Sequence, residues 1–111
     1  MIDREIVEKR EAKKIRLIRN EATKKAKKVA AILKKKYKAK KVILFGSLIS
    51  NGYLHEKTDI DILVEGMHPK DILQAGFEAS TIAAPFDVDI IPAEKADKCL
   101  LKIALNEGIE I

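Results

Sequence analysis

The chain has 111 residues, with 22 Lys or Arg, 17 Asp or Glu and one Cys. This length supports one domain with a single hydrophobic core, so a large substrate has to be held by a partner. One Cys cannot form an internal disulfide, and we expect a reducing, cytoplasmic location. No apolar run approaches the about 18 residues of a membrane span, and the N-terminus lacks the apolar core of about 7–15 residues that a signal peptide has.

The charge is divided unevenly along the sequence. Residues 1–41 hold seventeen basic and five acidic residues, a net charge of +12, whereas residues 42–111 carry a net charge of −7. We therefore expect one domain over residues 1–111, with a basic N-terminal helical segment at residues 1–40 attached to an acidic α/β core at residues 41–111.

The basic segment has the pattern of one long amphipathic helix or of two joined ones. Asp3 is a candidate N-cap, and apolar residues recur at spacings of three and four. These residues are Ile15, Ile18, Ala22, Ala26, Val29, Leu33 and Tyr37. From about residue 20 we expect the helix to pack on a sheet. The earlier residues, up to 19, are expected to project and to contribute to association, with another copy or with a partner.

Lysines cover the remaining surface of this expected helix. Most faces of this kind are simply solvated. The functional alternatives are a contact with a nucleic-acid backbone and docking on an acidic partner.

A Gly-Ser turn followed by two aspartates is the most informative feature. Residues 42–45 form an apolar strand pattern that ends at Gly46-Ser47, and Asp59 and Asp61 open a second strand pattern. Alternation along a strand places both carboxylates on one face, where they repel each other unless a cation compensates them. Magnesium is the expected cation, because it favours one or two carboxylates together with water and substrate phosphates.

The Gly-Ser turn is the expected phosphate site. Gly46 allows a phosphate to approach the backbone closely, and the Ser47 hydroxyl can donate a hydrogen bond to it. Ser47 can also cap a short helical turn over residues 48–51, whose free N–H groups attract anions.

The remaining sequence predicts further elements in order. After Gly66 and Pro69 we expect a helix over residues 71–82, a strand over residues 86–91 and a helix over residues 93–106 capped by Gly108. Residues 109–111 are expected either to add a short edge strand or simply to pack. The first of these helices offers Ile72, Leu73, Ala75, Phe77, Ala79 and Ile82 for packing. Cys99 is expected in the core, in the last helix. In the strand, Asp87 and Asp89 share a face, and alternation alone does not decide which of them joins Asp59 and Asp61.

Together, these motifs resemble the signature of minimal nucleotidyltransferases of the DNA polymerase β superfamily, over roughly residues 28–111. The motifs are Gly46-Ser47, Gly52, Asp59-Ile60-Asp61 and an acid on a later strand. The resemblance implies a nucleotidyltransferase fold, with a small mixed sheet flanked by helices. It also implies two magnesium ions bound by Asp59, Asp61 and Asp89, and a nucleotide bound at Gly46, Ser47 and Gly52. Asp89 is preferred to Asp87 because Val88-Asp89-Ile90 matches the family's valine-aspartate-aliphatic string.

The resemblance also implies a function. Many stand-alone domains of this type are antitoxins that add AMP to a tyrosine of a HEPN-class ribonuclease toxin. We therefore expect a magnesium-dependent adenylyltransferase that uses ATP, with a HEPN toxin as its partner. The alternatives are an antitoxin that blocks its partner by binding alone and an RNA-binding adaptor that uses the basic helix. The family commonly has a basic residue after Gly-Ser, where this chain has Leu48.

Overall fold

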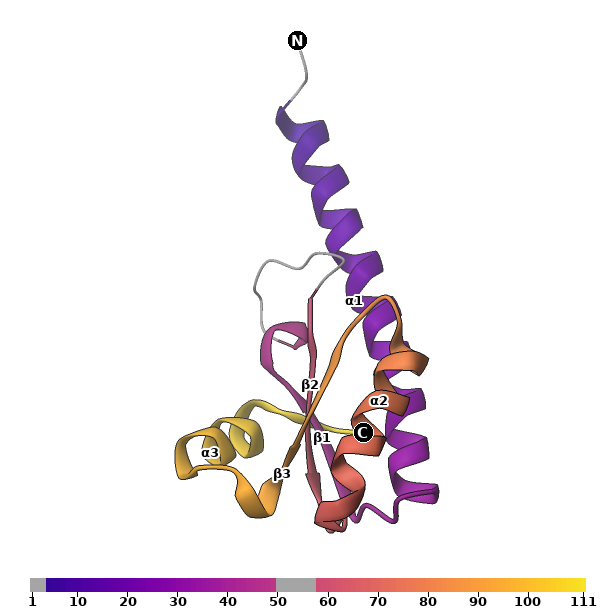
Figure 1. Cartoon of the computed structure of the whole chain (residues 1–111). Coiled ribbons are helices and arrows are strands. Elements are labelled where there is room, and N and C mark those ends of the chain that lie inside the picture. The colour runs from indigo at the N-terminus through magenta and orange to yellow at the C-terminus, as the bar shows by residue number, and fades with distance from the viewer. Residues whose placement is uncertain (1–3, 50–57) are drawn as a thin grey trace.

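A mixed four-stranded sheet forms the centre of the molecule, with helices on both faces (Figure 1). The structure is a computed structural model that describes residues 4–49 and 58–111, and for residues 4–8 and Ser47 it describes the backbone only. The strands are β1 (Lys41–Phe45), β2 (Ile60–Glu65), β3 (Val88–Pro92) and β4 (Ile109–Glu110), and the α-helices are α1 (Arg4–Lys35), α2 (Ile72–Ala83) and α3 (Lys98–Glu107). This architecture confirms the predicted α/β fold class.

The strand order is β3-β2-β1-β4. β1 runs antiparallel to β2 and β4, while β2 and β3 are parallel. A parallel pair needs a long crossover connection, and α2 provides it between β2 and β3. The expected C-terminal edge strand is therefore present as β4, beside β1.

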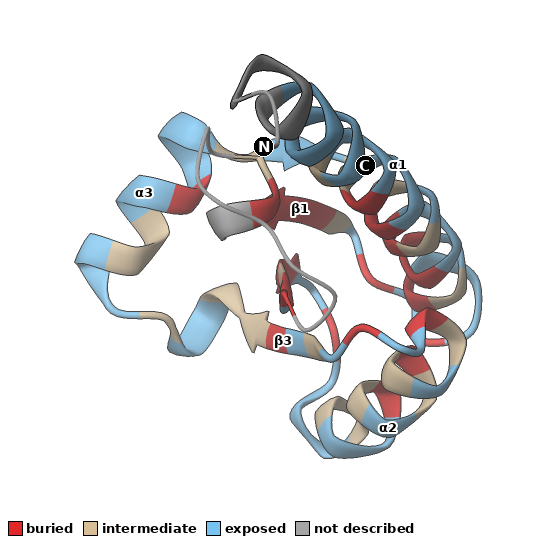
Figure 2. Ribbon diagram, turned by 90° about the horizontal axis from the view of Figure 1, so that it is seen from above, coloured by how far each residue is buried: buried red, intermediate tan, exposed pale blue. Residues whose placement is uncertain are grey.

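The main core lies between the sheet and the helices α1 and α2. Figure 2, seen from above, shows these two helices on one side of the sheet and α3 on the other. Alternate strand residues point toward α1 and α2 and are fully buried, among them Val42, Leu44, Ile60, Ile62 and Val64. The apolar stripe of α1 meets them with small residues such as Ala22 and Ala26, both 0% exposed, which bring the helix close to the sheet.

Helix α1 is continuous over 32 residues, which corresponds to about 48 Å at 1.5 Å per residue. The molecule measures 56 × 28 × 17 Å, so this helix sets its longest dimension. Residues 9–14 are exposed, Ile15 is partly buried, and full burial starts at Ile18. The predicted projection is thus confirmed for residues 9–14 (Figure 1), but packing begins at Ile15 and Ile18, earlier than the predicted residue 20. The candidate cap Asp3 lies outside the described residues.

Helix α3 packs on the opposite face of the sheet through a smaller cluster that includes Ile43, Leu63 and Ala104. The predicted start of this helix at residue 93 is wrong. Residues Ala93–Lys95 form a separate 3-10 turn, and Asp97 caps α3 by accepting a hydrogen bond from the Leu100 N–H at 2.7 Å.

Three side chains lie elsewhere than the sequence predicts. Cys99 is exposed, because α3 turns Leu100, Leu101 and Ala104 toward the sheet and Cys99 falls outside that stripe. On α2 the buried residues are Ala75, Ala79 and Ala83, whereas Leu73 and Phe77 face outward. Short side chains thus define the packed side of α2, and the largest ones lie away from it.

Gly108 ends α3 as predicted, for a steric reason. Its φ of −75° is open to any residue, but a Cβ at this position would lie 2.3 Å from the Ala104 carbonyl oxygen and 2.4 Å from Ile43 Cγ2. Close packing of the chain on β1 therefore requires glycine. No α-helix in the described ranges is long and apolar enough to cross a membrane.

The division of α1 into a packed and a projecting part predicts unequal effects on stability. Leu33→Ala, at a side chain that is 1% exposed, should lower the free energy of unfolding by about 2–5 kcal/mol. Deletion of residues 1–12 should change it by less than about 1 kcal/mol, because the described part of that segment is exposed. Urea denaturation measures both, and loss of the cooperative transition on deletion would contradict the division.

Candidate functional site

The candidate site lies where β1 ends and where β2 and β3 begin, on the face of the sheet that carries α3. The register pairs Phe45 of β1 with Asp61 of β2, and Asp61 with Asp89 of β3. Side chains that share this face belong to the α3-side cluster, as Phe45 and Leu63 do. Asp61 and Asp89 are therefore neighbours on adjacent strands, which lie about 4.8 Å apart, and their side chains point the same way.

Asp59 adds a third negative charge to this group. It lies just before β2, whereas the sequence pattern placed it within the strand together with Asp61. The pKa of Asp61 is raised above its ordinary value, first by burial and then by the charges of Asp89 and Asp59. Within the described residues, no ion pair connects any of the three carboxylates to a basic side chain. Their repulsion is thus uncompensated by the part of the chain that the structure describes.

Asp89 and Asp87 lie in different positions relative to Asp61. Asp89 is in register with Asp61, and its charge contributes to the raised pKa of Asp61. Asp87 precedes β3, and its backbone carbonyl accepts a hydrogen bond from the Ile60 N–H at 2.8 Å. The charge of Asp87 is not among the causes of that raised pKa. The geometry therefore favours Asp89 as the acid that acts together with Asp61.

Gly46 lies directly against the Asp61 carboxylate. Its φ is +85°, in the left-handed region that favours glycine, and a Cβ on it would lie 2.3 Å from Asp61 Oδ2. Two constraints, one conformational and one steric, thus require glycine here. The turn that follows β1 is held in contact with the acidic strand.

The turn itself differs from the predicted one. A 3-10 turn covers Gly46–Leu48, so it starts before the predicted helical turn, and Ser47 lies within it instead of capping it. Leu48 is 1% exposed and belongs to the main core. The position where the family commonly has a basic residue is therefore an apolar anchor in this chain. The Ser47 side chain and Gly52 lie outside the described residues.

The donor set suits a hard divalent cation. Neighbouring carboxylates that repel each other are stabilised by a divalent cation bound between them. No three His, Cys, Asp or Glu side chains within residues 9–49 and 58–111 form a group ready to hold a metal ion. Magnesium does not need such a cage, because it typically uses one or two carboxylates and takes its other ligands from water and phosphate. Asp61 with Asp59 or Asp89 meets that requirement.

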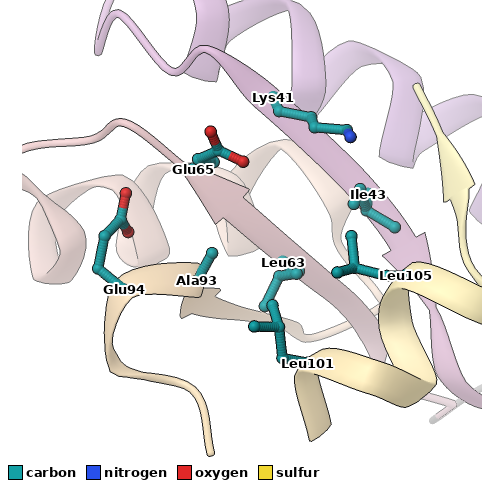
Figure 3. A pocket seen from close by; sticks show the side chains of 8 residues that line it. All are labelled: Lys41, Ile43, Leu63, Glu65, Ala93, Glu94, Leu101 and Leu105. Carbon is teal, nitrogen blue, oxygen red and sulfur yellow. The ribbon is translucent and has the colours of Figure 1, made fainter. Parts of the chain in front are cut away.

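A hollow of about 320 Å³ lies elsewhere, between α3 and the other end of β1 and β2. Figure 3 shows Ile43, Leu63 and Leu101 beside it, with Lys41 and Glu65 near the strand ends. Glu65 is the last residue of β2 and Asp61 the second, so this hollow is separate from the carboxylates. It does not extend the candidate site.

A Gly-containing turn against paired acids, at the end of a small mixed sheet, is the arrangement of a nucleotidyltransferase domain. The chain belongs to the polymerase β nucleotidyltransferase family, since the family model described as "Polymerase beta, Nucleotidyltransferase" matches residues 27–111. A comparison with curated proteins gives no match.

Solved structures of toxin–antitoxin complexes share the fold. A mutant MntA–HepT complex has a TM-score of 0.63 at 20% identity, over 77% of this chain and 70% of the other. Tri-AMPylated Shewanella oneidensis HEPN toxin in complex with MNT antitoxin gives a TM-score of 0.61 at 20% identity, over 80% and 70%. A toxin–antitoxin with AMP-PNP gives 0.62 at 23% identity, over 75% and 69%. At these identities the likeness concerns the fold.

The contact between Gly46 and Asp61 predicts a site-specific effect of a single methyl group. Gly46→Ala should displace the Asp61 carboxylate and weaken manganese binding at least tenfold, because the new Cβ and the carboxylate cannot share the same space. Calorimetric titration with Mn²⁺ measures this.

Gly76→Ala is the matched control. Gly76 lies within α2, and a Cβ there meets nothing within 4 Å. The substitution should leave manganese binding unchanged and raise the free energy of unfolding by about 0.5–1 kcal/mol. Equal manganese affinities in the two variants would show that Gly46 does not contribute to the metal site.

The raised pKa of Asp61 predicts a pH-dependent stability. The folded protein retains this proton at a higher pH than the unfolded chain does, so Asp61 lowers the free energy of unfolding as pH rises from 3.8 through the raised pKa. In EDTA, Asp61→Asn should therefore gain stability relative to wild type at pH 7 and less so at pH 4. Urea denaturation at both values measures the difference, with Asp87→Asn as control. A gain that is the same at both pH values would rule out this linkage.

Proposed function

We propose that the chain is a magnesium-dependent nucleotidyltransferase that transfers AMP from ATP to a hydroxyl group, the acceptor being a tyrosine of a HEPN-type toxin. The observation that carries the proposal is the register that places Asp61 beside Asp89, with Gly46 held against Asp61. Membership of the polymerase β nucleotidyltransferase family supports the reaction class. The fold shared with an MNT antitoxin bound to an AMPylated HEPN toxin supports the acceptor and the antitoxin role.

Asp59, Asp61 and Asp89 are the proposed ligands of two magnesium ions, which when bound neutralise the triphosphate and lower the pKa of the attacking hydroxyl. Gly46 is the proposed point at which the triphosphate approaches the backbone beside Asp61, because glycine carries no side chain of its own. Ser47 and Gly52 are the further residues proposed to bind the nucleotide.

The proposed transfer forms one bond and breaks one. The acceptor oxygen attacks the α-phosphorus of ATP, and the bond between that phosphorus and the bridging oxygen breaks, so pyrophosphate leaves with its electron pair. Asp89 is the proposed acceptor of the hydroxyl proton. The exposure of Asp89 at the start of the edge strand β3 makes it accessible to the acceptor.

One observation favours the alternative, an antitoxin that inhibits its partner by binding alone. Where the family commonly has a basic residue after Gly-Ser, this chain has Leu48, which is 1% exposed and belongs to the main core, and a blocking protein does not need a phosphate contact there. The two functions differ in what they require of Asp89, because a blocking surface does not depend on a general base.

Replacement of the proposed base decides between them. Coexpressed wild type should increase the mass of the partner by one or more AMP units, whereas Asp89→Asn should slow the transfer by about 10²–10⁴-fold. Both proteins should bind the partner with similar affinity. Mass spectrometry of the partner measures the modification, and Asp87→Asn is the matched control, with its activity retained.

The remaining outcomes are distinct. Activity lost in Asp87→Asn and retained in Asp89→Asn would assign the third acidic role to Asp87. A partner that is inhibited without any change of mass, equally well by wild type and Asp89→Asn, would establish blocking as the function.

A further inference from the structure

Helix α2 carries two large apolar side chains that nothing in the described chain covers. Leu73 is 74% and Phe77 is 70% exposed, the largest values among the exposed large hydrophobic residues of the described part. They are four residues apart on one helix and thus lie on the same face. A partner that covers this face removes apolar surface from water, which stabilises the complex.

The two side chains border a groove of about 310 Å³ between α2 and the edge strand β3, here called the α2–β3 groove. Gly76 lies in its wall, and the position where its Cβ would be faces open space. The Ser80 hydroxyl accepts a hydrogen bond from the Val88 N–H at 3.3 Å, which fastens α2 to β3 beside the groove. The α2–β3 groove therefore lies where Gly76 has no side chain, on a helix that is held against β3.

The groove borders the candidate site. Its lining includes Val88, Asp89 and Ile90, consecutive residues of the edge strand. Val88 and Ile90 point toward the core of α1 and α2, while the Asp89 side chain points to the opposite face, next to Asp61. A polypeptide seated in the groove thus lies alongside the edge of β3, and a long side chain can pass around this edge to the Asp89 carboxylate.

Charge and backbone pairing determine which kind of partner fits. Asp89 is the only charged residue that lines the groove among the described residues, so the groove repels the phosphates of a nucleic acid and accepts an uncharged or basic protein surface. Strand addition is disfavoured, because the Val88 N–H is already bound by Ser80 and Pro92 has no N–H. The occupant therefore binds through apolar side chains.

We propose that the α2–β3 groove is the docking site for the acceptor protein. An apolar side chain of the acceptor covers Leu73 and Phe77, and a neighbouring hydroxyl-bearing side chain, a tyrosine in the proposed reaction, reaches Asp89. The proposal rests on the proposed function for its acceptor. It explains how a domain of 111 residues positions a protein substrate, namely with a helix next to the site.

The test combines a variant of the groove with a matched control. Leu73→Ser/Phe77→Ser removes the two exposed side chains of α2, and Ile103→Ser/Leu105→Ser removes two from α3, where they are 48% and 52% exposed. Because all four residues are largely exposed, both proteins should fold. With the coexpressed HEPN-type partner as acceptor, the groove variant should show at least a tenfold higher KM and an almost unchanged kcat, and the control should match wild type. Binding of ATP with Mn²⁺ should be equal in all three.

A second variant fills the α2–β3 groove instead of removing its exposed apolar side chains. Gly76→Leu places a side chain in the open space and leaves Leu73 and Phe77 in place. It should raise the KM for the protein acceptor in the same way, and circular dichroism should show an intact fold.

Affinity for the partner, measured by calorimetric titration, separates this proposal from the proposed function. If no protein transfers AMP but the groove variants bind the partner at least tenfold more weakly, docking stands and the chemistry fails. If both groove variants bind and modify the partner as wild type does, docking in the groove is wrong. A change confined to self-association in light scattering would likewise overturn it and assign the groove to contacts between copies of this chain.

Discussion

Electrostatic repulsion between Asp61 and Asp89 is built into the sheet by the register of β2 and β3. The register itself is fixed by burial, because Ile60 and Ile62 are 0% exposed on the opposite face. A slip by one residue would turn the acids of β2 into the core and these isoleucines outward. Burial of the hydrophobic core thus supplies the free energy that holds the charges of Asp61 and Asp89 together. Loss of packing between the sheet and α1 would therefore also disrupt the candidate site.

Helices α1 and α2, which cover the face of the sheet opposite the acids, are connected to each other as well as to the sheet. Tyr37, just after α1, donates a hydrogen bond to Glu78 of α2 at 2.5 Å, and Lys36 pairs with the same carboxylate at 3.0 Å. These contacts, with Tyr37 first, lower the pKa of Glu78, so the connection persists at neutral pH. Glu78 follows Phe77 directly, and the contact therefore fixes the rotation of α2 that turns Phe77 toward solvent.

The parts of the fold that depend on local pattern could be predicted from the sequence. The strand pattern around Asp61 predicted β2, and the spacing of apolar residues predicted a long α1 that packs from about residue 20, close to the observed start of burial at Ile18. Choosing Asp89 over Asp87 needed either the family resemblance or the register of β2 with β3, since alternation treats both acids alike.

What could not be predicted depends on contacts between distant residues. Leu48 is a core anchor because the turn after β1 folds onto α1 and β2, and Gly108 is required by the proximity of Ile43. Leu73 and Phe77 were expected to pack like the other apolar residues of α2. Periodicity cannot show that alanines occupy the packed side of that helix and leave the largest residues outside. The steric role of Gly46 against Asp61 also becomes visible only in three dimensions.

The two edges of the sheet have a consequence for the behaviour of the molecule in concentrated solution. On one side, Ser80 and Pro92 leave β3 with few free donors, and on the other β4 has only two residues. Short or obstructed edges of this kind hinder the growth of sheets from one molecule to the next. The chain can therefore expose an apolar helix face to a partner without also offering a template for fibrous aggregation.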